Sequence, residues 1–439
     1  MTYEEAVRYI EDIPKFTKKH TLEHTREFLA QLHHPCRNAK VLHVAGTNGK
    51  GSVCAYLQAI LLCEGKHAGC FTSPHLETIR ERIKIDGEMI TEETFLRVFD
   101  KTMEAVERLK ESGLEHPSYF EFLYGMGMTA FAEAGTDYLI LETGLGGRLD
   151  ATNAFETPAV SIITSIGLDH KEILGETVPE IAAEKAGIIR TGVPVVFDAS
   201  DAESAAVIEN TAEKAGTFCR GISKDAVEIQ EITEKHIAFL TGSEYDSNTV
   251  WEIRGTGIYQ TMNASLALEA AHILLGDEIH RERWQKALAD VVWPGRMEEV
   301  LPGVVLDGAH NLPAIRQFAA SVQAQEAYER QTAGEARENV ILFSAVAEKD
   351  YTDMIAMLCE GVRAKAYVVT QICDKRRASG SALEEVFRKY ARCPVYVRDS
   401  IQEAFELAMR EKGEGGRLYC LGSLYLVGEL KTMIGGGYA

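Results

Sequence analysis

The segment HVAGTNGKGS at residues 43–52 combines glycines, a lysine and hydroxyl residues, the residue types that bind phosphate groups. An apolar run precedes it and a helical pattern follows, which is the context of a loop that holds phosphate groups. In such loops backbone N–H groups face the phosphates, Lys50 adds positive charge, and the hydroxyl of Ser52 or Thr47 can bind Mg²⁺. The spacing departs from G-x-x-x-x-G-K-[ST], because Gly51 stands where the hydroxyl residue belongs. A plain glycine turn is the alternative interpretation.

A second glycine cluster, LETGLGGRLDATN at residues 141–153, follows another apolar run. It fails the dinucleotide fingerprint G-x-G-x-x-G, because a pattern that begins at Gly144 ends on Leu149. Glu142 stands at the carboxyl end of the predicted strand, where open α/β sheets bind their ligands. A carboxylate beside a phosphate loop suits Mg²⁺, and a solvated glutamate at a strand end is the alternative.

Other polar side chains also follow apolar segments. TSPHL supplies Ser73 and His75, and TSIGLDH supplies Asp169 and His170. Lys185 stands near the end of a predicted helix. Taken singly, such histidines more often form structural hydrogen bonds than bind metals, and such a lysine more often lies on the surface.

The elements around these residues alternate between strand and helix. Strands are predicted at residues 41–46, 137–143, 158–167 and 192–198. Helices are predicted at residues 2–10, 21–33, 119–134, 176–187 and 262–275, and in the stretch that follows Ser52. This order predicts an α/β fold with a mostly parallel sheet and helices on both faces. Residues 225–260 are short and β-rich, which predicts a small antiparallel lobe.

Pro294 and Gly295 mark a predicted domain junction. Five apolar runs follow, at residues 304–310, 340–346, 366–371, 394–399 and 417–422. They predict a second, smaller α/β domain, which agrees with a chain of 439 residues that is too long for one ordinary core.

The composition bounds the class of protein. Lys and Arg total 46 and Asp and Glu total 66, so the formal charge of −20 argues against a nucleic-acid-binding surface. The nine cysteines form no C-x-x-C pair, which argues against zinc ribbons and disulfide frameworks and for a reducing compartment. The acidic first residues are unlike a signal peptide, and no apolar run reaches 18 residues. We expect a cytoplasmic, monomeric enzyme that binds neither nucleic acid nor membranes.

Ten segments in order carry a resemblance to a known family. They are HVAGTNGKGS (43–52), FTSPHL with RERIKIDGEMI (71–90), SYFEF (118–122), LETGLGGRLDATN (141–153), ITSIGLDH (163–170), IAAEKAGIIR (181–190), NASLAL (263–268), PGRME (294–298), LDGAHN (306–311) and GSLYLVGE (422–429). The chain resembles the Mur ligase superfamily, and within it the folylpolyglutamate synthases and bifunctional dihydrofolate synthase/folylpolyglutamate synthases. The glycine loop of that superfamily reads G-T-x-G-K-x-[ST], so the unusual spacing becomes a matching feature.

The resemblance implies a P-loop domain at residues 1–293 and a Rossmann-like, glutamate-binding domain at residues 294–439. It implies an ATP-dependent ligase that adds L-glutamate to folates, and we expect it to use dihydropteroate as well. ATP would phosphorylate a carboxylate, and the acyl phosphate would accept the α-amine of glutamate. The implied cofactors are ATP and one or two Mg²⁺ ions.

The resemblance also implies roles for single residues. Those implied for nucleotide binding are Gly46, Thr47, Asn48, Gly49, Lys50, Gly51, Ser52, Asn263, Arg296 and Asp307. Those implied for the metal are Ser73, Glu142 and His170. Those implied for the folate side are Ser118, Tyr119, Phe120, Glu121, Gly147, Arg148, Leu149, Asp150 and Ala151, and Ser423 is implied for the incoming glutamate. The catalytic residues implied are Lys50, Lys185, His170 and His310, and the superfamily carbamylates the lysine that Lys185 matches.

Some stretches depart from the family pattern. Thr143 stands where the family often has valine, and residues 345–350 follow the pattern only loosely. Residues 322–339 have the pattern of a variable, polar, helical excursion. Three other functions stay open: folylpolyglutamate synthase activity alone, a muropeptide-type ligase with the same loop and lysine, and a P-loop switch. Two observations argue against the P-loop switch. The sequence has no N-K-x-D guanine signature, and a switch protein would not explain the second domain with its LDGAHN segment.

Overall fold

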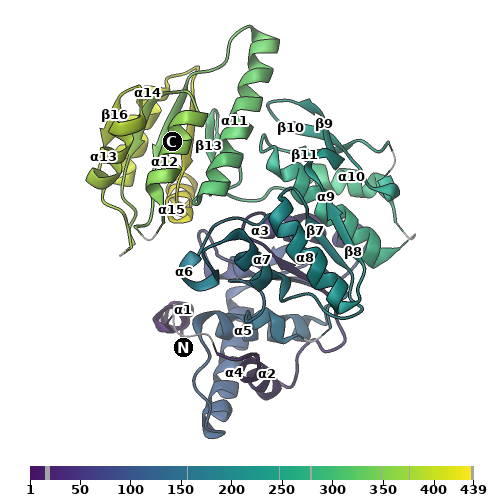
Figure 1. Cartoon of the computed structure of the whole chain (residues 1–439). Helices are drawn as coiled ribbons and strands as arrows, with labels where there is room; N and C mark the ends of the chain where they lie inside the picture. Colours follow the sequence, from purple (N-terminus) through teal and green to yellow (C-terminus); the bar gives the residue numbers. More distant parts are fainter. Residues whose placement is uncertain are drawn as a thin grey trace. The chain divides into compact units, whose positions relative to one another are not determined.

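The computed structural model describes residues 1–14, 20–155, 157–246, 248–276, 279–347, 349–374 and 376–436. The chain packs into two compact units (Figure 1). The first comprises Met1–Val227, Thr241–Thr249 and Met262–Leu288, and the second Glu228–Leu240, Val250–Thr261 and Ala289–Ala439. The domain boundary at residue 293 stays a prediction.

The first unit is built on a sheet with the strand order β4-β3-β2-β5-β1-β6-β7-β8. Its strands are β1 (Lys40–Ala45), β2 (Ala68–Phe71), β3 (Ile83–Ile85), β4 (Glu88–Met89), β5 (Tyr138–Glu142), β6 (Val160–Ile163), β7 (Val195–Asp198) and β8 (Cys219–Ile222). The six neighbours β2, β5, β1, β6, β7 and β8 pair in parallel. Strands β3 and β4 add an antiparallel edge beside β2. The predicted, mostly parallel sheet is therefore confirmed.

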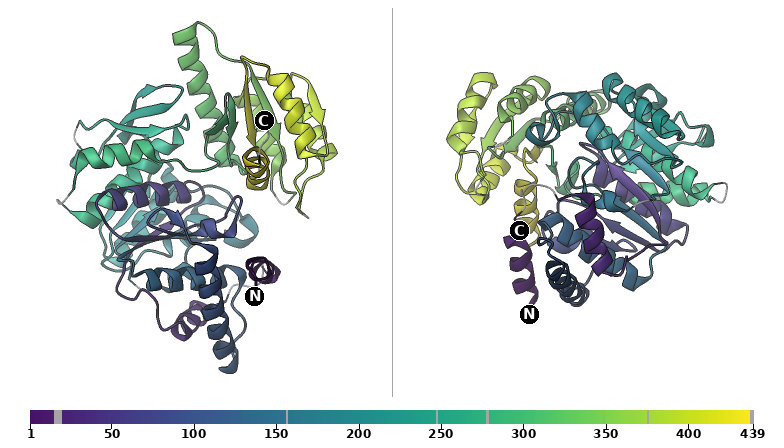
Figure 2. Two further views of the ribbon diagram at one scale, coloured as in Figure 1. Left: turned by 180° about the vertical axis from the view of Figure 1, so that it is seen from behind. Right: turned by 60° about the horizontal axis from the view of Figure 1, so that its bottom comes forward.

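Helices bury both faces of this sheet, which is why its central strands are continuously apolar. The helices up to residue 290 are α1 (Tyr3–Asp12), α2 (Leu22–Gln31), α3 (Lys50–Cys63), α4 (Glu92–Glu111), α5 (Tyr119–Ala134), α6 (Lys171–Leu174), α7 (Val178–Ala186), α8 (Ala202–Ala215), α9 (Tyr259–Leu275) and α10 (Arg281–Asp290). In Figure 2, α1 and α2 lie beside α4. The residues of α5 are those that the sequence predicts, whereas α3 begins at Lys50, before the predicted start.

The β-rich segment forms a three-stranded sheet, with β9 (Val227–Ile232), β10 (His236–Thr241) and β11 (Trp251–Arg254) in the order β11-β10-β9. Since β10 and β11 pair antiparallel, the predicted lobe is confirmed.

The second unit has a six-stranded sheet in the described residues, in the order β12-β13-β17-β14-β15-β16. Its strands are β12 (Glu298–Leu301), β13 (Val304–Leu306), β14 (Asn339–Phe343), β15 (Ala364–Val369), β16 (Val395–Val397) and β17 (Arg417–Leu421). Its helices are α11 (Leu312–Ala333), α12 (Tyr351–Gly361), α13 (Gly380–Tyr390), α14 (Ile401–Lys412) and α15 (Leu424–Gly435). All strand pairs except β12–β13 are parallel, as the predicted α/β domain requires.

The stretch 322–339 is helical over most of its length, as predicted, but the prediction of a polar excursion is wrong where its charged residues are buried. The stretch continues α11 to Ala333, and Glu326 and Glu329 are buried. The reason is a buried ion pair, because Arg417 Nη2 lies 2.5 Å from Glu329 Oε1. In the loosely matching stretch 345–350, residue 348 lies outside the described residues. Of the helices described, none combines the length and apolar character needed to cross a membrane.

We expect Glu329→Ala to destabilise the second unit by about 3–5 kcal/mol, because it leaves the buried Arg417 guanidinium without its carboxylate. The matched control is Arg388→Ala in α13, where an exposed pair with Glu384 contributes less than about 1 kcal/mol. Urea unfolding followed by circular dichroism measures both. Equal losses in the two variants would contradict the importance of burial.

Candidate active site

The glycine loop joins β1 to the N-terminus of α3, where the first backbone N–H groups of the helix have no partner inside the helix. Gly49 precedes α3 with φ of 89°, a conformation that favours glycine. A Cβ at Gly49 would lie 2.3 Å from Asn263 Oδ1, and one at Gly46 would lie 1.8 Å from Thr164 Oγ1. The loop therefore needs both glycines, and the structure brings Asn263 against it.

The segment after β6 holds the loop in place. Thr47 N donates to Ser165 O at 2.8 Å, and Thr164 Oγ1 donates to Asn48 O at 2.7 Å. The Thr47 hydroxyl donates to Gly167 O at 3.2 Å, so it already serves the loop. The sequence pointed to Asp169 and His170 in this segment but not to the anchoring role of Thr164 and Ser165, which depends on their contacts with the loop.

Ser52 is the hydroxyl that remains for a ligand. Its side chain is buried, and Ser52 Oγ has no hydrogen-bond partner among the described residues. A buried hydroxyl without a partner is costly, so its lone pairs suit a bound cation and its O–H suits a phosphate oxygen. Of the two hydroxyls that the sequence left open, the structure favours Ser52 over Thr47.

Two lysines and a carboxylate converge on the loop. Lys50 Nζ donates to Gly46 O and to Thr47 O, both at 3.2 Å, and Lys185 Nζ donates to the same Gly46 O at 2.6 Å. Glu142 is buried, with Oε1 4.0 Å from Lys50 Nζ. Ser73 N donates to Glu142 Oε2 at 2.9 Å. Four distant parts of the sequence thus meet at one end of the sheet.

His170 precedes α6, in the left-handed conformation with φ of 51°. Its backbone N–H donates to Asp169 Oδ1 at 2.9 Å, and its side chain is 42% exposed. Its role as a metal ligand stays a prediction.

The second glycine cluster is organised by Asp150. Its Oδ2 accepts hydrogen bonds from the backbone N–H groups of Gly144 and Leu145, both at 2.9 Å. A Cβ at Gly147 would lie 2.7 Å from Lys185 O, so this loop packs directly on the end of α7. Arg148 is exposed and pairs with Glu184 at 2.7 Å, Leu149 is exposed, and Ala151 begins a short 3-10 helix.

The SYFEF segment begins α5. Ser118 and Glu121 cap the helix reciprocally, since each side chain accepts a hydrogen bond from the backbone N–H of the other. The Tyr119 ring lies 5.5 Å from the Arg82 guanidinium, and the Phe120 ring lies against Gly144. The predicted folate-side residues therefore adjoin the second glycine cluster.

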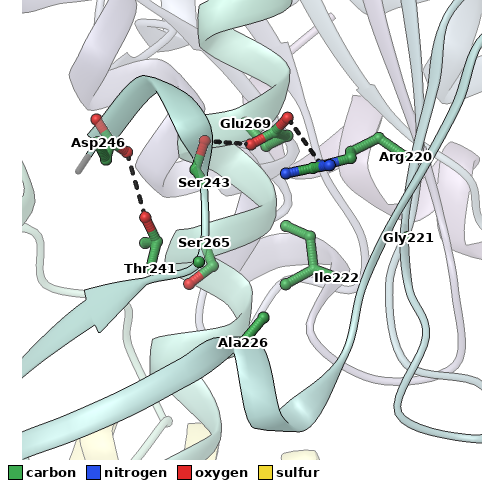
Figure 3. A pocket seen from close by; sticks show the side chains of 10 residues that line it. Arg220, Gly221, Ile222, Ala226, Thr241, Ser243, Asp246, Ser265 and Glu269 are labelled. Carbon is green, nitrogen blue, oxygen red and sulfur yellow. Dashed lines mark hydrogen bonds and ion pairs between the residues drawn. The ribbon is translucent and has the colours of Figure 1, made fainter.

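A cavity lies beside Ser118. Its volume of about 510 Å³ is that of a small-molecule site. Its lining residues are Tyr9, Asp12, Ile13, Pro14, His20, Glu115, His116, Pro117 and Ser118. A second hollow, in Figure 3, has a volume of only about 30 Å³, enough for about one water molecule. Figure 3 shows Glu269 there, accepting from Ser243 Oγ at 2.7 Å and lying 3.4 Å from Arg220. That hollow is too small for a nucleotide or a folate.

In the second unit, Asp307 is the centre of a hydrogen-bond network. Its carboxylate accepts from Tyr259 Oη at 2.8 Å, from Met297 N at 2.9 Å and from Ala309 N at 2.8 Å. Burial raises the pKa of Asp307, and the nearby Arg296 guanidinium acts in the opposite direction. Tyr259 is a neighbour of Asp307 that the sequence did not suggest, because no motif joins the two residues.

The other predicted residues of this unit lie around that network. A Cβ at Gly308 would lie 2.0 Å from Arg296 Nη1, and His310 Nδ1 lies 2.7 Å from Gly308 O. Ser423 caps α15 by accepting from Tyr425 N at 3.2 Å. Gly422 N donates to Ala309 O at 2.9 Å. The LDGAHN and GSLYL segments are thus bonded to each other, as a shared site requires.

Residues 44–271 match the Mur ligase middle domain family, a match that includes the glycine loop. The chain is 35% identical over 368 residues to the dihydrofolate synthase/folylpolyglutamate synthase of Bacillus subtilis, covering 81% of this chain and 82% of that protein.

Two solved structures have a similar fold over 99% of this chain and 98% of their own chains. One is Escherichia coli FolC in complex with DHPP and ADP, with a TM-score of 0.85 and 26% identity. The other is the bifunctional folylpolyglutamate synthase/dihydrofolate synthase of Yersinia pestis with AMPPNP and a Mn ion, with a TM-score of 0.83 and 26% identity.

We expect Gly49→Ala to weaken ADP binding at least about tenfold. The left-handed conformation costs a residue with a Cβ about 1–2 kcal/mol, and the new methyl group would displace Asn263. The matched control is Gly65→Ala, since Gly65 has φ of 67° but no heavy atom within 4 Å of a Cβ. Isothermal titration calorimetry with ADP checks both variants. Unchanged affinity in Gly49→Ala would contradict the loop assignment.

Proposed function

The chain belongs to the folylpolyglutamate synthase and dihydrofolate synthase members of the Mur ligase family, and from this premise we propose how its residues perform the reaction. As a member it is an ATP-dependent ligase that adds L-glutamate to folates. The observation that carries the proposal is the convergence of Lys50, Lys185 and Glu142 on one glycine loop.

The chemical problem is that a carboxylate is a poor electrophile. Transfer of a phosphoryl group to it gives an acyl phosphate with a good leaving group, and the glutamate amine then displaces phosphate. Such transfer depends mainly on positioning and on neutralising charge. The N-terminus of α3 and Lys50 supply fixed positive charge where the outer phosphates would lie.

A divalent cation fits the donors beside this loop. The residues that would hold it are Ser52, Ser73, Glu142 and His170. When bound, Mg²⁺ neutralises phosphate charge. Support comes from the unpartnered Ser52 hydroxyl and the buried Glu142 carboxylate, both oxygen donors of the kind Mg²⁺ prefers. The complex of the Yersinia pestis relative with AMPPNP and a Mn ion also supports it.

We propose that Lys185 is carbamylated, as the resemblance implies. Lys185 is buried, and its Nζ shares the Gly46 carbonyl with Lys50. Addition of CO₂ to a neutral amine would replace one of two neighbouring positive charges with a carboxylate. That carboxylate would add an oxygen donor near Glu142.

The folate side and the glutamate side use different units of the chain. The cavity beside Ser118 would take part of the folate, with the Phe120 ring and the Asp150 loop near it. In the second unit, His310 and Ser423 would contact the incoming glutamate. We also propose that dihydropteroate is a substrate, that the enzyme acts as a monomer, and that it works in the cytoplasm.

The central test is phosphate release from ATP. We expect release only when both a reduced folate and glutamate are present, and separately with dihydropteroate and glutamate. Release that ignores both acceptors would exclude the ligase. In Lys50→Ala the rate should fall at least about 1,000-fold, since Lys50 stabilises transferring charge. Lys101→Ala is the control, because Lys101 is exposed and pairs only with Glu133 among the contacts described for it.

Carbamylation is tested by intact mass. Protein kept under CO₂ and measured under native conditions should carry the mass of one added CO₂, and Lys185→Ala should not. Lys185→Ala should also lose ligase activity and regain part of it with added short carboxylic acids, which substitute for the carbamate. An unmodified mass together with no rescue would contradict the modification.

A further inference from the structure

Two histidines and a glutamate form a cluster in the first unit, outside the glycine loop. His20 lies just before α2, His24 lies in its first turn, and Glu121 lies in the first turn of α5. One ring nitrogen of His20, one of His24 and a carboxylate oxygen of Glu121 lie within 4.8 Å of one another. The two ring centroids lie 3.9 Å apart, with the ring planes tilted by 31° to each other. Both Nδ1 atoms approach the Glu121 carboxylate.

The hydrogen bonds of His24 fix which nitrogen holds its proton. His24 Nε2 lies 2.9 Å from the backbone oxygen of Glu115, which can only accept, so Nε2 carries the hydrogen. His24 Nδ1 is buried and has no hydrogen-bond partner in the part of the chain that the structure describes. It lies 3.6 Å from Glu121 Oε1, beyond hydrogen-bonding range. A buried ring nitrogen without a hydrogen-bond partner thus lies opposite a buried carboxylate, and a cation between them would bind to both.

The separation of these two atoms fits a metal ion. Zinc binds imidazole nitrogen and carboxylate oxygen at about 2.0–2.2 Å, so two ligands of a tetrahedral ion lie about 3.3–3.6 Å apart. The observed 3.6 Å lies at the upper end of this range. His20 Nδ1 lies 2.7 Å from Glu121 Oε2, the distance of a hydrogen bond that a metal would replace.

The outer nitrogens of both histidines face the same residue, Glu115. His24 Nε2 contacts its carbonyl, and His20 Nε2 lies 3.4 Å from its carboxylate. Histidines that bind metals almost always donate their other N–H to a carbonyl or a carboxylate, which fixes the ring and its tautomer. A zinc ion on His20 would therefore need only the transfer of the ring proton from Nδ1 to Nε2, toward Glu115.

We propose that His20, His24 and Glu121 form a binding site for a divalent transition metal of the zinc type. The fourth ligand position would face the 510 Å³ cavity, which His20 lines, and would hold water or a small anion. The ion would fasten the start of α2 to the start of α5. This site is separate from the oxygen-rich site at the glycine loop, and nitrogen ligands favour zinc over Mg²⁺.

The test is a zinc titration of the full chain, stripped of metals and supplied with excess Mg²⁺, against a chromogenic zinc chelator. We expect one Zn²⁺ per chain. His24→Gln should weaken binding at least about 100-fold, because the glutamine amide can keep the bond to Glu115 O but offers no nitrogen at the position of Nδ1. His20→Asn is the second variant, since the asparagine amide keeps the hydrogen bond to Glu121 and provides no metal ligand. Cobalt substitution should give the visible absorption of a tetrahedral site in the wild type and in neither of these two variants.

The control is His67→Gln, because the half-buried His67 pairs with Asp86 at 2.6 Å outside this cluster. Its zinc affinity should equal that of the wild type. Zinc should raise the Tm of the wild type and of His67→Gln, but not of the other two variants. Circular dichroism verifies that each variant is folded. A wild-type chain that binds no zinc, or equal zinc affinity in the wild type, His24→Gln and His20→Asn, would overturn the site.

Discussion

Two lysine ammonium groups, from Lys50 and Lys185, donate hydrogen bonds to one carbonyl oxygen, that of Gly46. Like charges this close repel each other, and burial strengthens the repulsion. The carboxylate of Glu142, 4.0 Å from Lys50, compensates only part of that charge. The site therefore favours anions strongly, and phosphate groups are the anions that the glycine loop and the start of α3 are shaped to receive. A carbamate on Lys185 would relieve the remaining repulsion.

The order of the strands explains why these residues meet. In the sequence of neighbours β2-β5-β1-β6, each parallel strand ends at the same edge of the sheet. Ser73 follows β2, Glu142 ends β5, the glycine loop follows β1, and Thr164 follows β6. The register holds these ends level, since Val44 pairs with Glu142 and Ala45 with Ile163. One sheet edge thus supplies the phosphate loop, its anchor and the carboxylate.

The sequence predicted β1, β5, β6 and β7 because buried parallel strands are continuous apolar runs, but it did not predict the short strands β2 and β8. It predicted the loop because glycine and lysine spacing is local information. What it missed depends on distant partners. From the sequence, the hydroxyls of Thr47 and Ser52 are equivalent candidates. In the structure Thr47 Oγ1 bonds to Gly167 O, whereas Ser52 Oγ has no partner among the described residues. Likewise, the sequence indicates an exposed position for Glu329, because its burial depends on the ion pair with the distant Arg417. The pairing of His24 with Glu121 has no sequence signature, because two helices far apart in the chain create it.

Glu121, a residue of the SYFEF motif, forms hydrogen bonds that hold the start of α5. The resemblance implies a folate-side role, yet its oxygens already accept from Ser118 N, Thr25 Oγ1 and the His20 ring. These bonds hold the first turn of α5, the turn that carries Phe120 against Gly144. A change at Glu121 would therefore act on the folate side through the position of Phe120. The carboxylate of Glu121 thus fixes the start of a helix.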